Sequence, residues 1–329
     1  MQIYKKNMNT IVFSYNYCIF AIKKRYIMVK VSVILPIFNV ASYLEETFNS
    51  LINQSLNEIE IIAVNDGSTD KSEEIIEKYK QQDSRIITVY QRNQGQSVAR
   101  NAGLALAKGE YIYMMDSDDV LNSPDALRIC YEYAKNTHAD FIFFDGDIYL
   151  EDRTRPISWN YKRTYLIDEG RKYEGKHLLN KMLDNNKHNC VVWLLLIDHA
   201  YLKSIGLKFY PGIIHEDELF TTILTLKSNS IYGLKQSFIK HRIRNTSTMG
   251  KQYSKRNINC YLTVVDELLK YENSIIIKKY AKYTLSKVFY TGSVIPFRNK
   301  FSVFWRALKS GYIKYIGLKS TIVFWLKQR

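Results

Sequence analysis

The sequence predicts an α/β protein built on a mostly parallel sheet with helices on both faces. Short apolar runs alternate with segments of helical periodicity from Met28 to about residue 145, and this alternation is typical of strands joined by crossover helices. Polar clusters follow three of the apolar runs, at residues 36–39, 65–68 and 116–119. Because ligands of open α/β sheets bind at the carboxyl ends of strands, these clusters are the first candidates for a functional site.

Five apolar runs are expected to form the strands. They comprise residues 30–35, 59–64, 86–90, 110–115 and 141–144. The first run is closed by Pro36, and the second ends at Asn65-Asp66-Gly67-Ser68. Such short apolar runs bounded by turn residues suit buried strands.

Helices are expected in the connections between these strands. Leu44, Phe48 and Leu51 recur at helical spacing in the first connection. In the second connection, Asp70 or Ser72 is expected to cap a helix whose first turn carries acids, which the helix dipole favours.

The next two helices are expected from their end signals. Residues 97–107 are rich in alanine and should form a helix that stops at Gly109, a residue type common just after a helix. Ser123 and Pro124 are expected as the N-cap and first residue of a helix that runs to about Ala134.

The net charge of +15 is concentrated at the two ends of the chain. Residues 251–329 carry a net charge of +13 and residues 1–27 carry +5, so residues 28–250 are slightly acidic, at −3. A basic tail suits nucleic acid or an anionic membrane surface. The acidic middle argues against nucleic acid as the primary partner, and none is expected.

The region before Met28 is expected to be a disordered leader or a gene-boundary artefact, with translation starting at Met28. The best apolar run there, residues 11–22, is interrupted by polar residues and is shorter than the ~20 residues of a membrane-spanning helix. The chain has four scattered cysteines and no CxxC, which indicates reduced thiols in the cytoplasm and argues against a zinc site.

Asp116-Ser117-Asp118-Asp119 places three carboxylates directly after an apolar strand. Clustered carboxylates repel one another unless a positive charge is shared among them, and a hard divalent cation that also holds phosphate oxygens meets this need. A polar loop or helix cap is the alternative interpretation of this stretch.

Three other residues have a chemical and a structural interpretation. Asp66 can accept a hydrogen bond from a nucleoside or simply shape an Asp-Gly turn, and Arg100 can pair with Asp66 or a diphosphate or be a solvated cation. Asp217 lies beside apolar residues, where desolvation suits a general base, but an acidic helix start is the better explanation if this cluster is taken alone.

Together these segments resemble family 2 glycosyltransferases over about residues 29–247. The resemblance depends on their order, and the segments are Val33-Ile34-Leu35-Pro36, Phe38-Asn39, Gln54-Ser55, Asn65-Asp66-Gly67-Ser68, Ala99-Arg100-Asn101, Gly109-Glu110-Tyr111, Asp116-Ser117-Asp118-Asp119 and Glu216-Asp217. The resemblance implies a GT-A (Rossmann-like) domain over residues 28–249, with a nucleotide-sugar half (28–145) and an acceptor half (146–249). Residues 250–329, interrupted by Pro296, are expected to form a helical, basic, aromatic-rich extension outside it.

The resemblance also implies an activity, which is metal-dependent transfer of a single sugar with inversion from a nucleotide-sugar, expected to be a UDP-sugar. The acceptor would be a hydroxyl of a glycan or lipid-linked molecule in bacterial surface-polysaccharide synthesis. The QxxRW motif of processive synthases is absent, which favours addition of one sugar. The alternative is a catalytically weak or inactive relative that binds nucleotide-sugars or carbohydrates.

Site residues follow from the same resemblance. Asp217 would be the catalytic base, Asp118 and Asp116 would hold Mn²⁺ or Mg²⁺, and Asp119 would contact the donor sugar. Trp193 and Glu216 would lie on the acceptor side. Nucleotide or donor binding would involve Pro36, Phe38 (in place of a frequent Tyr), Asn39, Asp66, Arg100, Arg242 and Arg244, although a structural salt bridge suits Arg242 and Arg244 equally.

The aromatic and basic extension has two interpretations. Its aromatic residues and cations suit the headgroup region of an anionic membrane, so peripheral attachment to the cytoplasmic face of the inner membrane is one. The other is a helical lid whose aromatic residues pack on the core. Either way, the protein is expected in the cytoplasm.

Overall fold

The computed structural model describes residues 28–151, 160–188, 190–244 and 253–326. The expectations for residues 1–27 and the end of the resemblance, near residue 247, lie outside the described residues. The described residues form one sheet with the strand order β3-β2-β1-β4-β7-β6-β8-β5. The strands are β1 (Val31–Ile37), β2 (Ile59–Asn65), β3 (Ile86–Tyr90), β4 (Tyr111–Met114), β5 (Val120–Leu121), β6 (Phe141–Leu150), β7 (Leu195–Asp198) and β8 (Ile231–Ile243).

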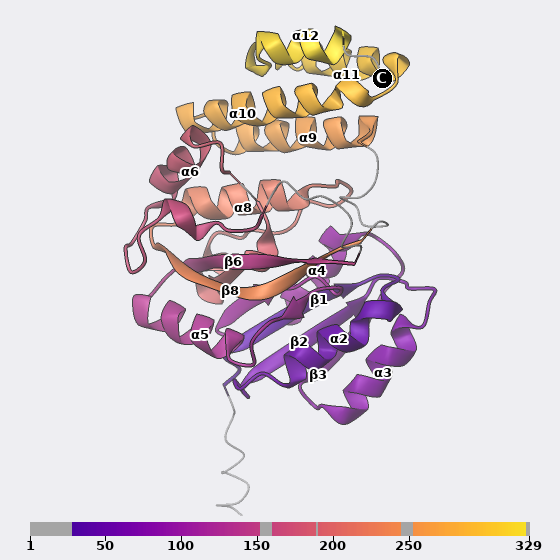
Figure 1. The fold of residues 1–329 in the computed structure, drawn as a ribbon, viewed down its shortest axis with the longest axis vertical. Coiled ribbons are helices and arrows are strands. Elements are labelled where there is room, and N and C mark those ends of the chain that lie inside the picture. Colours follow the sequence, from indigo (N-terminus) through magenta and orange to yellow (C-terminus); the bar gives the residue numbers. More distant parts are fainter. Residues whose placement is uncertain (1–27, 152–159, 189, 245–252, 327–329) are drawn as a thin grey trace, which may run out of the picture.

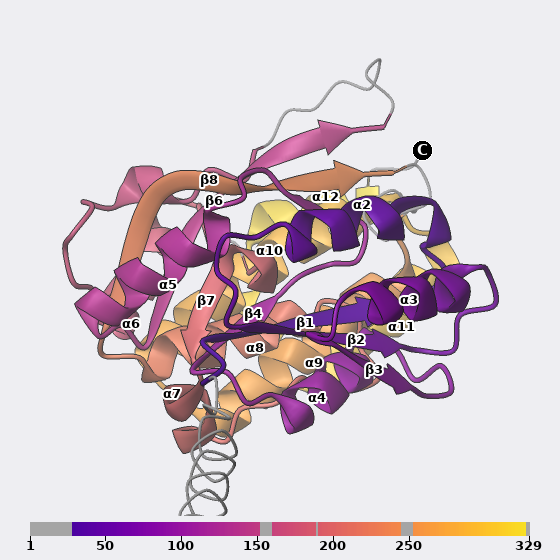
Figure 2. The ribbon, with the colours of Figure 1, turned by 90° about the horizontal axis from the view of Figure 1, so that it is seen from below.

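Helices cover both faces of this sheet, so the predicted fold class is confirmed (Figure 2). The α-helices are α2 (Ala41–Ile52), α3 (Ser72–Gln82), α4 (Gln96–Leu106), α5 (Ala126–Thr137), α6 (Gly175–Asp184), α7 (His199–Ser204), α8 (Glu216–Lys227), α9 (Lys255–Tyr271), α10 (Ile275–Thr291), α11 (Phe297–Lys309) and α12 (Leu318–Leu326). Short 3₁₀ turns lie at Thr164–Leu166, Val192–Leu194, Gly292–Val294 and Ile313–Tyr315.

The two halves of the sheet differ in strand direction. In the first half, β1 pairs in parallel with β2 and β4, and β2 pairs in parallel with β3, as the alternating pattern predicts. In the second half β7 is antiparallel to both β4 and β6, and β5 is antiparallel to β8, while β6 and β8 are parallel. The sheet is therefore mixed, and β7 and β8 were not foreseen as strands.

Alternating side chains of β1 enter different apolar clusters on the two faces, as the two-residue period of a strand requires. Val33 and Leu35 join the cluster formed with α2, α3 and α5. Ile34 joins the cluster on the other face, which includes residues of α4, α6 and α8. Figure 2 shows α2 and α3 on one side of β1 and β2, and α4 on the other.

Helix α8 is buried on two sides. Phe220 and Leu224 point into the cluster next to the sheet, whereas Leu219 and Ile223 enter a third cluster formed with α9 and α10. Figure 1 shows the resulting stack, in which α8 lies above the sheet, α9 and α10 lie above α8, and α11 and α12 form the outermost layer. The predicted helical extension is thus present, with α11 beginning directly after Pro296.

Two glycines allow close backbone approach at the sheet. A Cβ on Gly103 of α4 would lie 2.5 Å from Cγ2 of Ile34, so this helix packs as closely to β1 as its small residues predict. A Cβ on Gly109 would lie 2.4 Å from the backbone nitrogen of Ser32. The predicted role of Gly109 at the helix end was wrong, since α4 ends at Leu106 and Gly109 permits contact between two neighbouring strands.

The start of helix α5 also differs from the prediction. Helix α5 begins at Ala126 with Asp125 as its N-cap, so Ser123 and Pro124 form the turn before it. This turn is held by Gln54, whose side chain donates a hydrogen bond of 2.8 Å to the carbonyl of Ser123. Asp70 accepts hydrogen bonds from the backbone nitrogens of Ala41 and Ser72, and so joins the starts of α2 and α3.

Candidate active site

Asp66 follows β2 and braces the loop that leads into α4. Its Oδ1 accepts hydrogen bonds from the side chain of Gln91 (2.6 Å) and the backbone nitrogen of Gln94 (2.9 Å), and its Oδ2 accepts one from Gly95 (2.8 Å). The side chain is buried. A carboxylate offers about four lone-pair sites, so Asp66 can shape this loop and still accept one further hydrogen bond at Oδ2.

The segment after β1 places an aromatic ring at the rim of the same sheet edge. Pro36 is buried within β1, whereas Phe38 is 47% exposed. Asn39 adopts a left-handed backbone conformation (φ 51°), and its side chain accepts a hydrogen bond of 2.8 Å from the backbone nitrogen of Thr69. This bond fixes the β1 loop against the β2 loop and leaves the Phe38 ring available for stacking.

Arg100 links the end of β4 to the start of α8. Its guanidinium donates to Asp116 at 2.9 Å and to Glu216 at 2.7 Å, and it is almost fully buried. The expected pairing of Arg100 with Asp66 is not formed, because the oxygens of Asp66 serve the loop before α4. Two acids that are 100 residues apart in sequence are therefore joined by one cation.

Asn101, the neighbour of Arg100, holds the chain that leads into α8. Its side chain donates to the carbonyl of Phe209 (2.8 Å) and accepts from the backbone nitrogen of the same residue (2.9 Å). The Arg100 guanidinium also lies 5.1 Å from the centre of the Phe209 ring. These contacts explain why the first turn of α8 lies against α4.

The three carboxylates after β4 have three different cationic partners. Asp116 pairs with Arg100, Asp118 pairs with Arg244 at 2.8 Å, and Asp119 pairs with His241 at 2.9 Å. The side chains of Asp116 and Asp118 are 21% and 12% exposed, whereas that of Asp119 is fully buried. Asp119 therefore faces β8, and this placement disagrees with the expected contact to a donor sugar.

His241 and Asp119 form a buried charged pair. The negative charge and hydrogen bond of Asp119 outweigh burial and raise the pKa of His241 to about 9. Burial raises the pKa of Asp119 to about 6, although His241 opposes this shift. The His241 ring also stacks on Trp193, with ring centres 4.5 Å apart, and Trp193 is only 4% exposed. Trp193 thus supports this pair, and little of its indole remains to line an acceptor site.

Arg242 is held in place from several directions. Its side chain donates to the carbonyl of Asp118 (2.9 Å), its backbone nitrogen donates to Asp119 (2.8 Å), and its guanidinium pairs with Glu46. The guanidinium also lies over the ring of Tyr149, at 4.4 Å. Arg242 is therefore held by Glu46 and the loop after β4, while Arg244 pairs with Asp118.

Asp217 differs from the other acids of the site. It lies in the first turn of α8 and is partly exposed, and its Oδ1 accepts a hydrogen bond of 3.0 Å from the backbone nitrogen of Glu218. Burial, followed by the charges of Glu216 and Glu218, holds the pKa of Asp217 well above its usual value, while Arg100 opposes this shift. A carboxylate with a raised pKa is suited to accept a proton near neutral pH.

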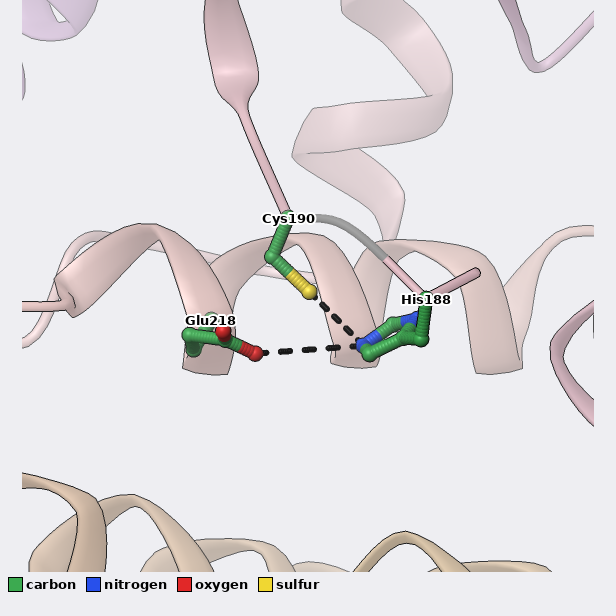
Figure 3. Close-up of side chains that lie close together, drawn as sticks. All are labelled: His188, Cys190 and Glu218. Atoms are coloured by element: carbon green, nitrogen blue, oxygen red, sulfur yellow. Dashed lines mark hydrogen bonds and ion pairs between the residues drawn. The ribbon is translucent and has the colours of Figure 1, made fainter. Parts of the chain in front are cut away.

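A second polar cluster lies directly behind Asp217, and sequence reasoning missed it. Figure 3 shows its members, with Cys190 Sγ 2.7 Å from His188 Nε2 and Glu218 Oε2 3.9 Å from the same nitrogen. Tyr280 of α10 donates a hydrogen bond of 2.8 Å to Glu218. Burial raises the pKa of Cys190 and lowers that of His188, so both groups are neutral at pH 7. The cluster ties the start of α8 to His188 and Cys190, which follow α6, and to α10.

The acids after β4 fit a hard divalent cation. Asp116 and Asp118 supply partly exposed carboxylate oxygens, which Mg²⁺ and Mn²⁺ prefer as ligands. The guanidinium of Arg244 pairs with Asp118, so a positive charge already lies beside this carboxylate. Within the described chain, Asp116, Asp119 and His241 also approach closely enough to share an ion, but His241 carries a proton until pH rises through about 9.

Comparison with known proteins identifies the family. The sequence profile described as "Glycosyl transferase family 2" matches residues 32–206, which is more than half of the chain. The chain belongs to this family. The match covers β1 to α7 and ends before Asp217, so the assignment of the base depends on the geometry of α8.

Several family members resemble parts of the chain. The uncharacterized glycosyltransferase EpsJ of Bacillus subtilis is 45% identical over 106 residues, which are 32% of this chain and 31% of EpsJ. The cholesterol galactosyltransferase of Borreliella burgdorferi is 30% identical over 256 residues, which are 74% of this chain and 68% of that protein. The chain thus spans only about a third of the length of EpsJ.

Two solved structures of glycosyltransferases share the fold. Staphylococcus aureus TarS, in complex with UDP-GlcNAc, matches with a TM-score of 0.64 and 22% identity over 90% of this chain and 78% of the TarS chain. The mannosyltransferase PcManGT from Pyrobaculum calidifontis, in complex with GDP-Man and Mn²⁺, matches with a TM-score of 0.57 and 13% identity over 89% and 78% of the two chains. These matches confirm the GT-A fold that the resemblance implied.

Proposed function

We propose that this family 2 glycosyltransferase transfers one sugar from a UDP-sugar to a hydroxyl of a glycan or lipid-linked acceptor, with inversion. The observation that supports the proposal is the buried bridge from Asp116 through Arg100 to Glu216, because it joins the acids after β4 to the first turn of α8, to which Asp217 belongs. TarS complexes with UDP and UDP-GlcNAc support a UDP-sugar as donor.

The donor would bind at the carboxyl ends of β1, β2 and β4. In this proposal the nucleobase of the donor stacks on Phe38, and the nucleoside donates a hydrogen bond to Oδ2 of Asp66. Asp116 and Asp118 would hold Mn²⁺ or Mg²⁺, which when bound neutralises charge on the departing diphosphate. The Mn²⁺ complex of PcManGT supports this assignment. Arg244 would leave Asp118 and pair with the diphosphate.

Asp217 would take the proton of the acceptor hydroxyl. The acceptor oxygen then forms a bond to the anomeric carbon while the bond from that carbon to the phosphate oxygen breaks, and the nucleoside diphosphate leaves with the electron pair. Attack from the face opposite the leaving group inverts the anomeric centre. The raised pKa of Asp217 supports this role, since an ideal general base titrates near the working pH.

Glu216 and Asp119 would act through other residues. Glu216 is bound to Arg100, so we assign it to positioning Arg100 and the first turn of α8. Asp119 would hold His241 and Arg242 against the site. Trp193 would position His241 by stacking.

The acceptor and the cellular location remain part of the proposal. The name of the Borreliella burgdorferi relative, cholesterol galactosyltransferase, supports a hydroxyl on a lipid as acceptor. Among the described residues no helix is both long enough and apolar enough to cross a bilayer. We therefore propose a cytoplasmic protein that reaches its acceptor at the membrane surface.

Incubation of the purified protein with UDP-sugars and Mn²⁺ tests the function. Slow release of UDP without acceptor, accelerated by a lipid-linked acceptor pool and yielding a product one sugar heavier by mass spectrometry, would support the transferase. Tight donor binding without UDP release would instead support a non-catalytic binding protein. Replacing Mn²⁺ with EDTA should abolish both donor binding and release.

A further inference from the structure

The outermost layer of the molecule exposes two rows of bulky apolar side chains. On α11, Phe297, Phe301, Trp305 and Leu308 are 48–58% exposed and recur at helical spacing. On α12, Leu318, Ile322 and Leu326 are 47–77% exposed and recur every four residues. Scattered apolar residues on a surface are ordinary, but aligned rows mark an interaction site.

The two rows adjoin and form one surface, named here the α11–α12 face. The ring of Trp325 on α12 lies 6.0 Å from that of Phe297, 5.0 Å from that of Phe301 and 5.2 Å from that of Phe304. Trp325 thus joins the end of α12 to three aromatic residues of α11. Figure 1 places both at the end of the molecule farthest from β1–β3.

The opposite sides of the same helices are buried in the core. Val303 and Ala307 of α11 and Phe324 of α12 are fully buried in the cluster shared with α9 and α10. Packing on the core therefore accounts for the inner sides of α11 and α12. It does not account for the exposed rows, of which Phe297 and Phe301 contact the neighbouring helix α12 through their rings.

The charge around the α11–α12 face is of one sign. Residues 273–329 contain twelve Lys or Arg and no Asp or Glu. Among them Arg298, Lys309, Lys314 and Lys319 are exposed on or next to α11 and α12. Aromatic and aliphatic side chains flanked by cations are the composition of helices that lie in the headgroup region of anionic bilayers.

We propose that the α11–α12 face docks on the surface of an anionic lipid bilayer, with its apolar rows inserted among the headgroups and its lysines and arginines facing lipid phosphates. This inference rests on the proposed function, for which it names the surface that meets the lipid-linked acceptor. A second copy of the chain fits less well, because a symmetric contact through this face would bring two acid-free, positively charged surfaces together.

Sedimentation with lipid vesicles tests the proposal on the full chain. The wild-type protein should bind vesicles of phosphatidylcholine mixed with phosphatidylglycerol, bind phosphatidylcholine alone at least tenfold more weakly, and lose affinity as salt rises. The double variant Phe301→Ser/Trp305→Ser should bind the anionic vesicles at least tenfold more weakly. Lys314→Gln/Lys319→Gln should weaken binding by a smaller factor and flatten the salt dependence.

A matched control uses apolar residues of similar exposure elsewhere. Tyr90 of β3 and Leu106 of α4 are each 44% exposed, and Tyr90→Ser/Leu106→Ser should leave vesicle binding unchanged. Absence of wild-type binding to anionic vesicles, or equal binding by Phe301→Ser/Trp305→Ser, would overturn the proposal. So would a wild-type dimer in light scattering that this double variant converts to a monomer.

Vesicle binding and chemistry are read separately in this design. UDP release measured without vesicles should be the same for wild type and Phe301→Ser/Trp305→Ser, because the face lies beyond α9 and α10 from the candidate active site. If vesicles bind but no UDP-sugar is consumed, the docking surface stands and the proposed function fails. If UDP-sugars are consumed but vesicles do not bind, the reverse holds.

Discussion

Two groups of acids meet in the candidate active site, and they differ in how their charge is balanced. Asp116, Asp118 and Asp119 each contact a cation within 3 Å. The side chain of Asp217 accepts a hydrogen bond from a backbone nitrogen, and its two neighbours in sequence are also acids. The comparison separates carboxylates suited to remain ionised beside a cation and diphosphate from one suited to gain and lose a proton.

The difference arises from where the residues lie in the fold. Asp118 and Asp119 face the end of β8, where His241 pairs with Asp119 and Arg244, directly after the strand, pairs with Asp118. Asp116 pairs instead with Arg100 of α4. Asp217 lies in the first turn of α8, where the helix dipole favours a negative charge but burial opposes it. Burial prevails, and so the pKa of Asp217 rises.

The largest expected effect is that of replacing Asp217, the acid without a paired cation among the described residues of the site. Asp217→Asn should lower the rate of sugar transfer by about 10²- to 10⁴-fold, the usual contribution of a general base. Binding of UDP and Mn²⁺, measured by calorimetry, should change little. Glu218→Gln is the neighbouring control, since it keeps an acceptor for Tyr280, and it should retain most of the activity. Normal transfer by Asp217→Asn would refute the base assignment.

A smaller effect, on metal-dependent binding, is expected from replacing one of the acids after β4. Asp118→Asn should weaken Mn²⁺-dependent UDP binding by at least the roughly 10- to 100-fold that loss of a partner in the outer shell of a metal costs. A titration of UDP binding with Mn²⁺ measures the effect. Asp147→Asn, which removes an exposed partner of Lys162, serves as the control. Equal Mn²⁺ dependence in Asp118→Asn and wild type would remove Asp118 from the metal site.

The His241–Asp119 pair predicts a dependence of stability on pH. The folded pKa of His241, about 9, exceeds its unfolded value of about 6.5, so its proton stabilises the fold fully below pH ~6.5 and is lost as pH rises through about 9. In metal-free protein, wild type should exceed His241→Gln by about 2 to 3 kcal/mol of unfolding free energy at pH 7, where most of Asp119 is ionised, and by less at pH 10. Urea unfolding across this range measures the difference, and a constant gap would contradict the charged pair.

The smallest effect concerns the contact between the extension and α8. Tyr280→Phe removes one buried hydrogen bond to Glu218 and should lower the unfolding free energy by about 1 to 2 kcal/mol. Tyr283→Phe on the same helix is the control. The rate of sugar transfer should fall less than in Asp217→Asn. If the two variants were equally stable, the bond would have no part in holding α8.

Much of the first half of the sheet could be predicted from local patterns. The runs that became β1 to β4 and β6, the helices between them and the acids after β4 are all signalled by neighbours in sequence. The antiparallel β7 could not be foreseen, because Leu195–Asp198 is only four residues long and its pairing with β4 and β6 depends on distant strands.

The contacts within the site were harder to predict because they join distant residues. The partner of Arg100, Glu216, is 116 residues away, and that of Asp119, His241, is 122 residues away. Arg242 and Arg244 were expected near the site, but the sequence did not indicate which acid each would meet. Turn residues also misled, since Gly109 serves strand contact and Ser123-Pro124 precedes the helix.

The double-sided burial of α8 has a consequence for engineering. Leu219 and Ile223 belong to the same apolar cluster as Ile258, Leu262 and Leu285. The helix that carries Asp217 therefore cannot be grafted without the helices that pack on it. A chimera intended to exchange acceptor preference should therefore transplant residues 216–326 as one cassette, because Val303, Ala307 and Phe324 of the last two helices belong to the same cluster.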